Sequence, residues 1–207
     1  MLGLSEDLVE PPDGIVARYI YAPVCSQLDA KLSNRRLHPI HLSALALLSA
    51  LTSGLASYIG EPVLGGVLAF AALLTSWLGW RRMERLRTSA SWIIMGSTLD
   101  RLGEVFIISG MIASPSTAGG LWRLIGVLAL AGSLAVSYTA VRAGREFKAF
   151  TWRGLSAYGA ARDVRFTLIA VSSIVKVPTL GLTVLAALTL SAVAKRSLDL
   201  LSLGDAT

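Results

Sequence analysis

Long apolar stretches alternate with short polar connections along most of this chain. Six stretches are dominated by aliphatic and small residues, and a membrane-spanning helix needs about 20 such residues. The expected spans are 39–60, 62–80, 92–113, 121–141, 166–175 and 179–194. The fifth is short unless residues 163–165 lie at the membrane interface. The pattern predicts an all-α integral membrane protein with six transmembrane helices.

The segment before the first span has a different pattern. In residues 15–32, aromatic and aliphatic residues mix with Arg18, Asp29 and Lys31, too densely charged for a span. This mixture is typical of an amphipathic helix that lies in the membrane interface. We therefore expect a single domain, 1–207, in which residues 1–38 form a lead and an interfacial helix and residues 39–196 form the bundle. The acidic start lacks a basic segment followed by an apolar core, so no cleaved signal peptide is expected.

Composition agrees with this pattern. Of 207 residues, 54% are hydrophobic and 15% are charged, and the mean hydropathy is +0.63, which is high for a soluble domain. The net charge is +6, but the basic residues are spread between apolar runs and no aromatic stacking platform accompanies them, so nucleic acid is not an expected partner. The single cysteine, Cys25, has no partner for an internal disulfide.

The cationic residues predict the orientation. Alternate connections are rich in arginine and lysine, whereas the opposite side holds only Arg123 and Lys176 near the span ends. The rich side comprises Arg18, Lys31, Arg35, Arg36, the arginines between 81 and 87, six cations between 142 and 165, Lys195 and Arg196. By the positive-inside rule, we expect a multi-pass protein of the cell membrane with both termini cytoplasmic.

Two acids lie inside the third expected span. Asp100 and Glu104 are one helical turn apart, so both carboxylates face the same way on a helix. A charge near the bilayer centre costs roughly 2.5–3.5 kcal/mol on insertion scales, which marks these acids as candidate functional residues. The alternative is a structural pair, in which Asp100 binds Arg101 or another cation and holds helices together. His38 and His41 have no third ligand nearby, and we expect an interfacial role for them.

At this point the residues resemble a family, the CDP-alcohol phosphotransferases, over most of the chain. The resemblance rests on four segments in order: RRLHPIHLSALALLSAL at 35–51, STLDRLGE at 97–104, SYTAVRA at 137–143 and GAARDVR at 159–165. It implies a six-helix membrane enzyme of phospholipid biosynthesis. Such an enzyme transfers a phosphatidyl-type group from a CDP-lipid to an alcohol and releases CMP.

The family signature, D-x-x-D-G-x-x-A-R-x8-G-x-x-x-D-x-x-x-D, is degenerate here. In one register Asp100 is the fourth aspartate and Gly79 is the first glycine, while Thr75 and Leu78 replace the first two aspartates. A register shifted by four matches Arg87, Gly96 and Asp100 and places Glu104 at the fourth acid. In that register Gly79 and Arg82 stand where the first two aspartates belong. Neither register supplies the first two acids.

The resemblance also implies roles for particular residues. Asp100 would be the catalytic base, and Asp100 with Glu104 would ligate Mg²⁺ or Mn²⁺. The remaining implied contacts are Gly79, Arg82 and Arg87 to nucleotide or phosphate, and Arg142, Arg162 and Arg165 to acceptor or lipid headgroup. Because the other acids are missing, one ion at most is expected, unless Glu84, Glu146 or a second subunit restores the site. For the arginines between 81 and 87, the favoured alternative to phosphate binding is an anchor on anionic headgroups.

Three functions remain open from the sequence. The chain is an enzyme that acts on a CDP-lipid donor within the membrane, or a catalytically silent relative that is a partner of an active paralogue. The third alternative is a small lipid-binding or transport protein. Transport is disfavoured because intramembrane charges outside 100–104 are almost absent. The family resemblance also implies a homodimer, or a heterodimer with a paralogue.

Overall fold

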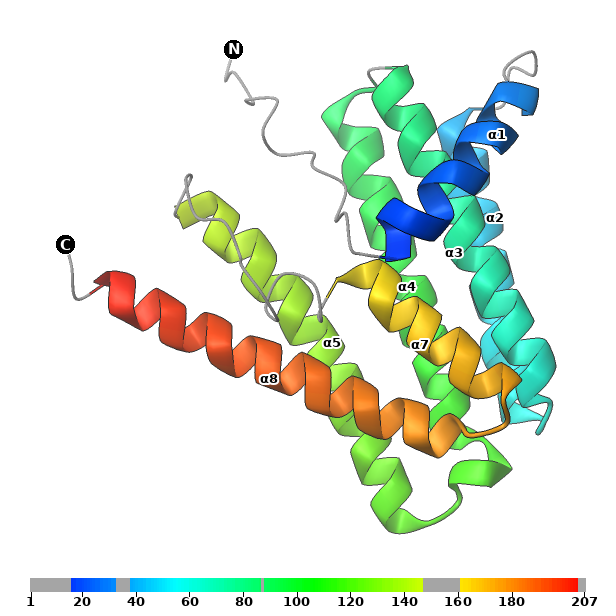
Figure 1. Cartoon of the computed structure of the whole chain (residues 1–207), viewed down its shortest axis with the longest axis vertical. Coiled ribbons are helices and arrows are strands. Elements are labelled where there is room, and N and C mark those ends of the chain that lie inside the picture. The colour runs from blue at the N-terminus through cyan, green and yellow to red at the C-terminus, as the bar shows by residue number, and fades with distance from the viewer. Residues whose placement is uncertain (1–15, 33–37, 87, 147–160, 205–207) are drawn as a thin grey trace.

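The computed structural model describes residues 16–32, 38–86, 88–146 and 161–204, and within these ranges every regular element is a helix (Figure 1). Side chains are not described for residues 32, 140–146, 200 and 202–204. The N-terminal segment consists of η2 (Ala17–Tyr21), a short π-helix, continued by α1 (Ala22–Leu32). The elements that follow are α2 (Pro39–Tyr58), α3 (Pro62–Arg85), α4 (Ala90–Ala113), the 3-10 turn η3 (Pro115–Thr117), α5 (Gly120–Glu146), α7 (Arg162–Ile174) and α8 (Pro178–Gly204).

Proline and glycine positions explain several helix boundaries. Pro39 and Pro62 stand at the first positions of α2 and α3, where the missing N–H costs nothing and the fixed φ favours a helix. His38 caps α2, because its side chain accepts a hydrogen bond from the Ile40 backbone N–H. Gly60 has a φ of +91°, which lets the chain turn tightly between α2 and α3.

Close contacts between small residues bring the helices together. Helix α2 packs against both α3 and α4, α3 packs against α7, and α5 packs chiefly against α8. Gly54 of α2 and Gly110 of α4 bring their backbones into direct contact, with no room for a Cβ on Gly110. Gly66 of α3 meets the backbone of α7 at Ala170 in the same way. Small residues of this kind let membrane helices approach closely. In Figure 1, α5 and α8 lie side by side and diverge from α2 and α3 toward their C-terminal ends.

Four helical stretches are long and apolar enough to cross a membrane: 39–58, 62–85, 120–139 and 178–199. Length and composition therefore mark the chain as a membrane protein. Helices also form at the third and fifth expected spans, as α4 and α7. These two helices do not meet the same criteria of length and apolar composition. Helix α4 carries three charged side chains, and α7 has only 13 residues. Helix α7 begins at Arg162, four residues before the expected start.

The segment expected to be an interfacial helix is helical from Ala17 to Leu32. One face, with Ala17, Tyr21 and Cys25, is completely buried against the bundle, while Ile20 and Val24 are exposed. The expected helical extension of the second span is also present, because α3 continues through the arginines to Arg85.

Candidate functional site

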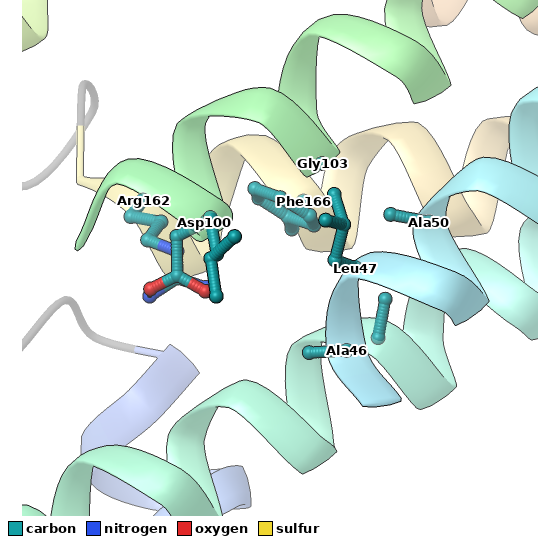
Figure 2. A pocket seen from close by; sticks show the side chains of 9 residues that line it. Ala46, Leu47, Ala50, Asp100, Gly103, Arg162 and Phe166 are labelled. Carbon is teal, nitrogen blue, oxygen red and sulfur yellow. The ribbon is translucent and has the colours of Figure 1, made fainter. Parts of the chain in front are cut away.

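A small cavity lies where α2, α3, α4 and α7 meet (Figure 2). Its volume is about 10 Å³, roughly the room of one water molecule. The lining is mostly apolar, with Ala46 and Ala50 from α2 and Phe166 from α7. Its charged groups are Asp100 of α4 and Arg162 of α7. The acid predicted from the sequence therefore borders a small cavity between the helices.

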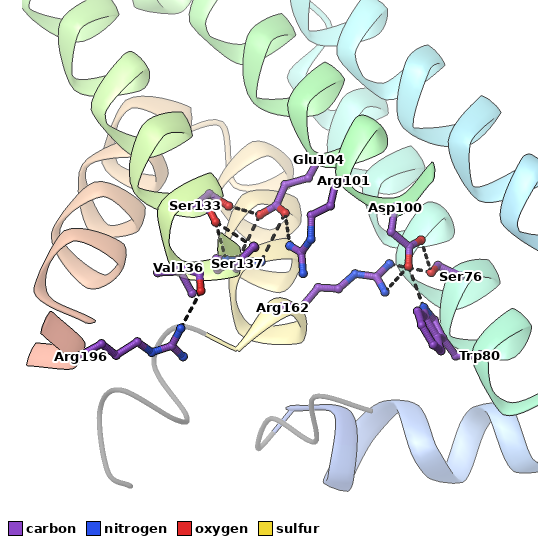
Figure 3. Close-up of polar contacts among 11 residues, drawn as sticks. Ser76, Trp80, Asp100, Arg101, Glu104, Ser133, Val136, Ser137, Arg162 and Arg196 are labelled. Atoms are coloured by element: carbon purple, nitrogen blue, oxygen red, sulfur yellow. Dashed lines mark hydrogen bonds and ion pairs between the residues drawn. The ribbon is translucent and has the colours of Figure 1, made fainter. Parts of the chain in front are cut away.

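The Asp100 carboxylate is almost fully hydrogen-bonded (Figure 3). Ser76 donates its hydroxyl to Oδ1 at 2.5 Å, and Trp80 donates its indole N–H to Oδ2 at 2.7 Å. The Nη1 atom of Arg162 lies 2.6 Å from Oδ2. Nη2 of Arg162 in turn donates to the Ser76 hydroxyl at 2.6 Å. Asp100 is thus held in a closed network that joins α3, α4 and α7.

Glu104 makes a second, separate network (Figure 3). Its side chain is fully buried, and Nε of Arg165 lies 3.1 Å from Oε1. Arg101, on the same helix, donates from Nη1 to Oε2 at 2.8 Å, and the Ser133 hydroxyl of α5 donates to Oε1. Arg165 also donates to the Ser133 carbonyl at 3.1 Å. This network joins α4, α5 and α7.

Helical spacing explains how both networks form together. Asp100 and Glu104 are one turn apart on α4, and Arg162 and Arg165 are one turn apart on α7. The long arginine side chains of α7 reach across to the acids of α4, Arg162 to Asp100 and Arg165 to Glu104. Removing a charge from water is costly unless a partner of opposite charge and further hydrogen bonds compensate. The paired arrangement therefore explains how four charged groups are buried in one bundle.

The donor set does not suit the divalent cations that the family resemblance implies. Mg²⁺ and Mn²⁺ require several oxygen ligands with free lone pairs. Asp100 instead accepts from an arginine, an indole and a hydroxyl, and Glu104 is bound by two arginines and a hydroxyl. Within the described residues, no group of three or more His, Cys, Asp or Glu side chains could hold an ion. Positive guanidinium groups stand where cations would have to bind.

The other predicted site residues lie apart from these networks. Gly79 of α3 packs against Leu42 of α2, where a Cβ would lie 3.4 Å from the leucine Cβ. Arg82 faces the N-terminal segment, and its Nε atom lies 3.0 Å from Oδ1 of Asp29. Arg87 lies outside the described residues, and Arg142 belongs to the end of α5, whose side chains are not described. Of the predicted residues whose side chains are described, Asp100, Glu104, Arg162 and Arg165 come together, whereas Gly79 and Arg82 lie apart.

Sequence reasoning missed the neutral donors and the pairing. Ser76 and Trp80 lie one turn apart on α3, a spacing that would have indicated a shared face toward an acid. The sequence predicted that a structural pair would join Asp100 to Arg101 or to another cation, and the partner in the structure is another cation. Arg162 binds Asp100, while Arg101 binds Glu104.

The amino-acid sequence is similar to those of two known proteins. No protein-family model matches the chain. It is 35% identical over 188 residues to a protein of Rubrobacter xylanophilus named bifunctional IPC transferase and DIPP synthase, covering 86% of this chain and 41% of the relative. A protein of the same name from Thermococcus kodakarensis is 25% identical over 130 residues, covering 63% of this chain and 30% of the relative.

The chain therefore spans less than half the length of both relatives. Their names describe a transferase and a synthase. Together with the apolar helices, this similarity supports the resemblance to the CDP-alcohol phosphotransferases.

Proposed function

We propose that this chain is a membrane protein of the CDP-alcohol phosphotransferase type that takes part in phospholipid synthesis as a catalytically silent partner of an active paralogue. In this proposal it keeps the six-helix fold, with both termini cytoplasmic and an interfacial helix, and associates with membrane lipids and with the CDP-lipid donor. The similarity to a named transferase supports the family role.

The observation that carries the silent role is the pairing of both acids with buried arginines. A general base needs a free lone pair directed at the acceptor hydroxyl, but the Asp100 oxygens accept from Ser76, Trp80 and Arg162. Two-metal phosphoryl transfer needs cations that neutralise the pyrophosphate and bridge the reacting oxygens. In this chain Asp100 and Glu104 pair with guanidinium groups instead.

The second candidate is an active transferase, and the relatives' names favour it. In that case Asp100 would be the base and Asp100 with Glu104 would bind one Mg²⁺ or Mn²⁺, which requires Arg101, Arg162 and Arg165 to leave the acids. Arg162 and Arg165, together with Arg142, would then be available to a phosphorylated acceptor or a lipid headgroup. Gly79, Arg82 and Arg87 would contact the nucleotide.

Release of CMP separates the two candidates. The purified full-length chain is incubated with a CDP-diacylglycerol donor, Mg²⁺ or Mn²⁺, and a panel of alcohol acceptors that includes inositol phosphate and glycerol phosphate. We expect no CMP above the level without protein, and retention of the labelled donor on the protein in a parallel binding assay. Turnover that Asp100→Asn abolishes would establish the transferase. The matched control is Asp199→Asn, which removes a partly exposed carboxylate that pairs with Lys195.

A further inference from the structure

The N-terminal segment makes specific polar contacts with two helices of the bundle. We call residues 17–29, which comprise η2 and most of α1, the N-terminal strap. The backbone N–H of Ala17 donates to Oδ2 of Asp163 on α7 at 2.7 Å, and the Tyr21 hydroxyl lies 2.8 Å from the Thr167 hydroxyl one turn further along α7. The start of the strap is thus fixed to α7 at two points.

The other end of the strap is fixed to α3. Asp29 pairs with Nε of Arg82 at 3.0 Å and with Nη1 of Arg85 at 3.2 Å. Between the two ends, Arg81 donates to the Ala22 carbonyl at 3.0 Å. The strap therefore runs from α7 to α3 and crosses the line of contact between these helices.

The same line of contact contains the partners of Asp100. Ser76 and Trp80 belong to α3, and Arg162 of α7 directly precedes Asp163, the residue that holds the start of the strap. In Figure 3 the ribbon of the N-terminal segment lies on the side of the site where Trp80 and Arg162 are drawn. The start of the strap is therefore held next to the arginine that pairs with Asp100.

The strap also carries an apolar outer face. On the outer face, Ile20, Val24 and Leu28 recur at helical spacing and are exposed. An apolar stripe of this kind can enter the boundary between headgroups and acyl chains, which gives the released strap an alternative favourable environment.

We propose that the N-terminal strap is a latched cover. Asp163 and Thr167 form the latch on α7, and its release exposes the α3–α7 contact, with Asp100 and Arg162, to water and lipid headgroups. The opening of the cover does not depend on whether the chain is a silent partner or an active transferase. Its test therefore stands apart from the assay of CMP release.

Cys25 reports whether the strap is docked. It is the single cysteine of the chain, its side chain is fully buried between the strap and α3, and burial raises the pKa of its thiol. A maleimide reacts with an exposed thiolate, so modification requires the strap to lift. The rate of labelling by a water-soluble maleimide is measured on the full chain in phosphatidylcholine–phosphatidylglycerol vesicles.

We expect Asp163→Ala to increase the labelling rate of Cys25 roughly tenfold, because it removes a charge-assisted hydrogen bond from the docked state only. Thr167→Val removes the contact with Tyr21 and the hydroxyl's hydrogen bond to the Asp163 carbonyl within α7, and it is expected to give a smaller increase in the same direction. Thr167→Val also tests the latch if Asp163→Ala fails to fold. Asp199→Ala, which alters an exposed ion pair with Lys195 on α8, serves as the control and is expected to label at the wild-type rate.

A second labelling site tests whether the strap covers the acid. In a Cys25→Ala background, Ser76→Cys places a thiol beside Asp100, and Thr167→Val is expected to accelerate its labelling as well. Unchanged rates at Cys25 in both latch variants would overturn the latch. Faster labelling at Cys25 without any change for the Ser76→Cys thiol would show that the strap moves but does not cover the site.

Discussion

Glu104 offers the sharpest test of how the buried charges are balanced. It is fully buried and faces two arginines, Arg165 at 3.1 Å and Arg101 at 2.8 Å. Glu104→Gln leaves both cations without a carboxylate. Breaking a buried pair from one side costs about 3–5 kcal/mol of folding free energy, and we expect Glu104→Gln to reach that range.

Arg165→Met should cost less, about 1–3 kcal/mol, because Glu104 keeps the hydrogen bonds from Arg101 and Ser133 and remains a satisfied carboxylate. In the double variant the buried arginine and the acid are both absent. Arg101, whose side chain is 32% exposed, can turn toward water. We therefore expect the double variant to be more stable than Glu104→Gln alone, with a coupling free energy of about 2 kcal/mol or more between the two sites.

Reversible unfolding in mixed detergent micelles, followed by tryptophan fluorescence or circular dichroism, gives the four free energies of this cycle. Asp199→Asn, at a half-exposed pair with Lys195, is the control and should change the free energy by less than about 1 kcal/mol. Additive effects of Glu104→Gln and Arg165→Met would contradict the reasoning, since they would mean that the two side chains do not stabilise each other.

Two further predictions concern helix packing and the Asp100 network. Gly110→Ala should destabilise the fold by several kcal/mol, because the new Cβ would collide with the backbone of Gly54. A Cβ at Gly120 would meet nothing within 4 Å, so Gly120→Ala should be close to neutral. Thermal unfolding of both variants, followed by circular dichroism, compares their stabilities. Trp80→Phe removes the indole donor from Asp100 and should cost about 1–3 kcal/mol. An unchanged melting temperature in this variant would exclude a role for that hydrogen bond.

Much of the helical framework could be predicted from the apolar pattern. The stretches at 39–60 and 62–80 become α2 and α3, and the proline that starts each helix is visible in the sequence. Their boundaries are local properties, set by proline, glycine and the change from apolar to charged residues. Helix α7 was harder to delimit, because its first turn carries Arg162, Asp163 and Arg165, which look like a polar loop until their buried partners are known.

The pairing within the candidate site could not be predicted in the same way. The spacing of the two acids and the presence of the arginines are plain in the sequence, but Arg165 and Glu104 are 61 residues apart. Only the packing of α7 against its neighbours decides that these groups neutralise each other rather than bind a ligand. The family signature favoured metal ligation. In the structure, however, the two acids pair with guanidinium groups and accept hydrogen bonds from hydroxyl groups.

Binding of Mn²⁺ tests the central claim, that arginines rather than metal ions neutralise the acid pair, most directly. The purified full-length chain is titrated with Mn²⁺, and the free ion is followed by electron paramagnetic resonance. Wild type and Asp100→Asn are measured in parallel, so that weak binding at exposed acids cancels. The account predicts that the two titrations coincide. Tight binding of one or more ions to the wild type, lost in Asp100→Asn, would contradict it and would favour the active transferase.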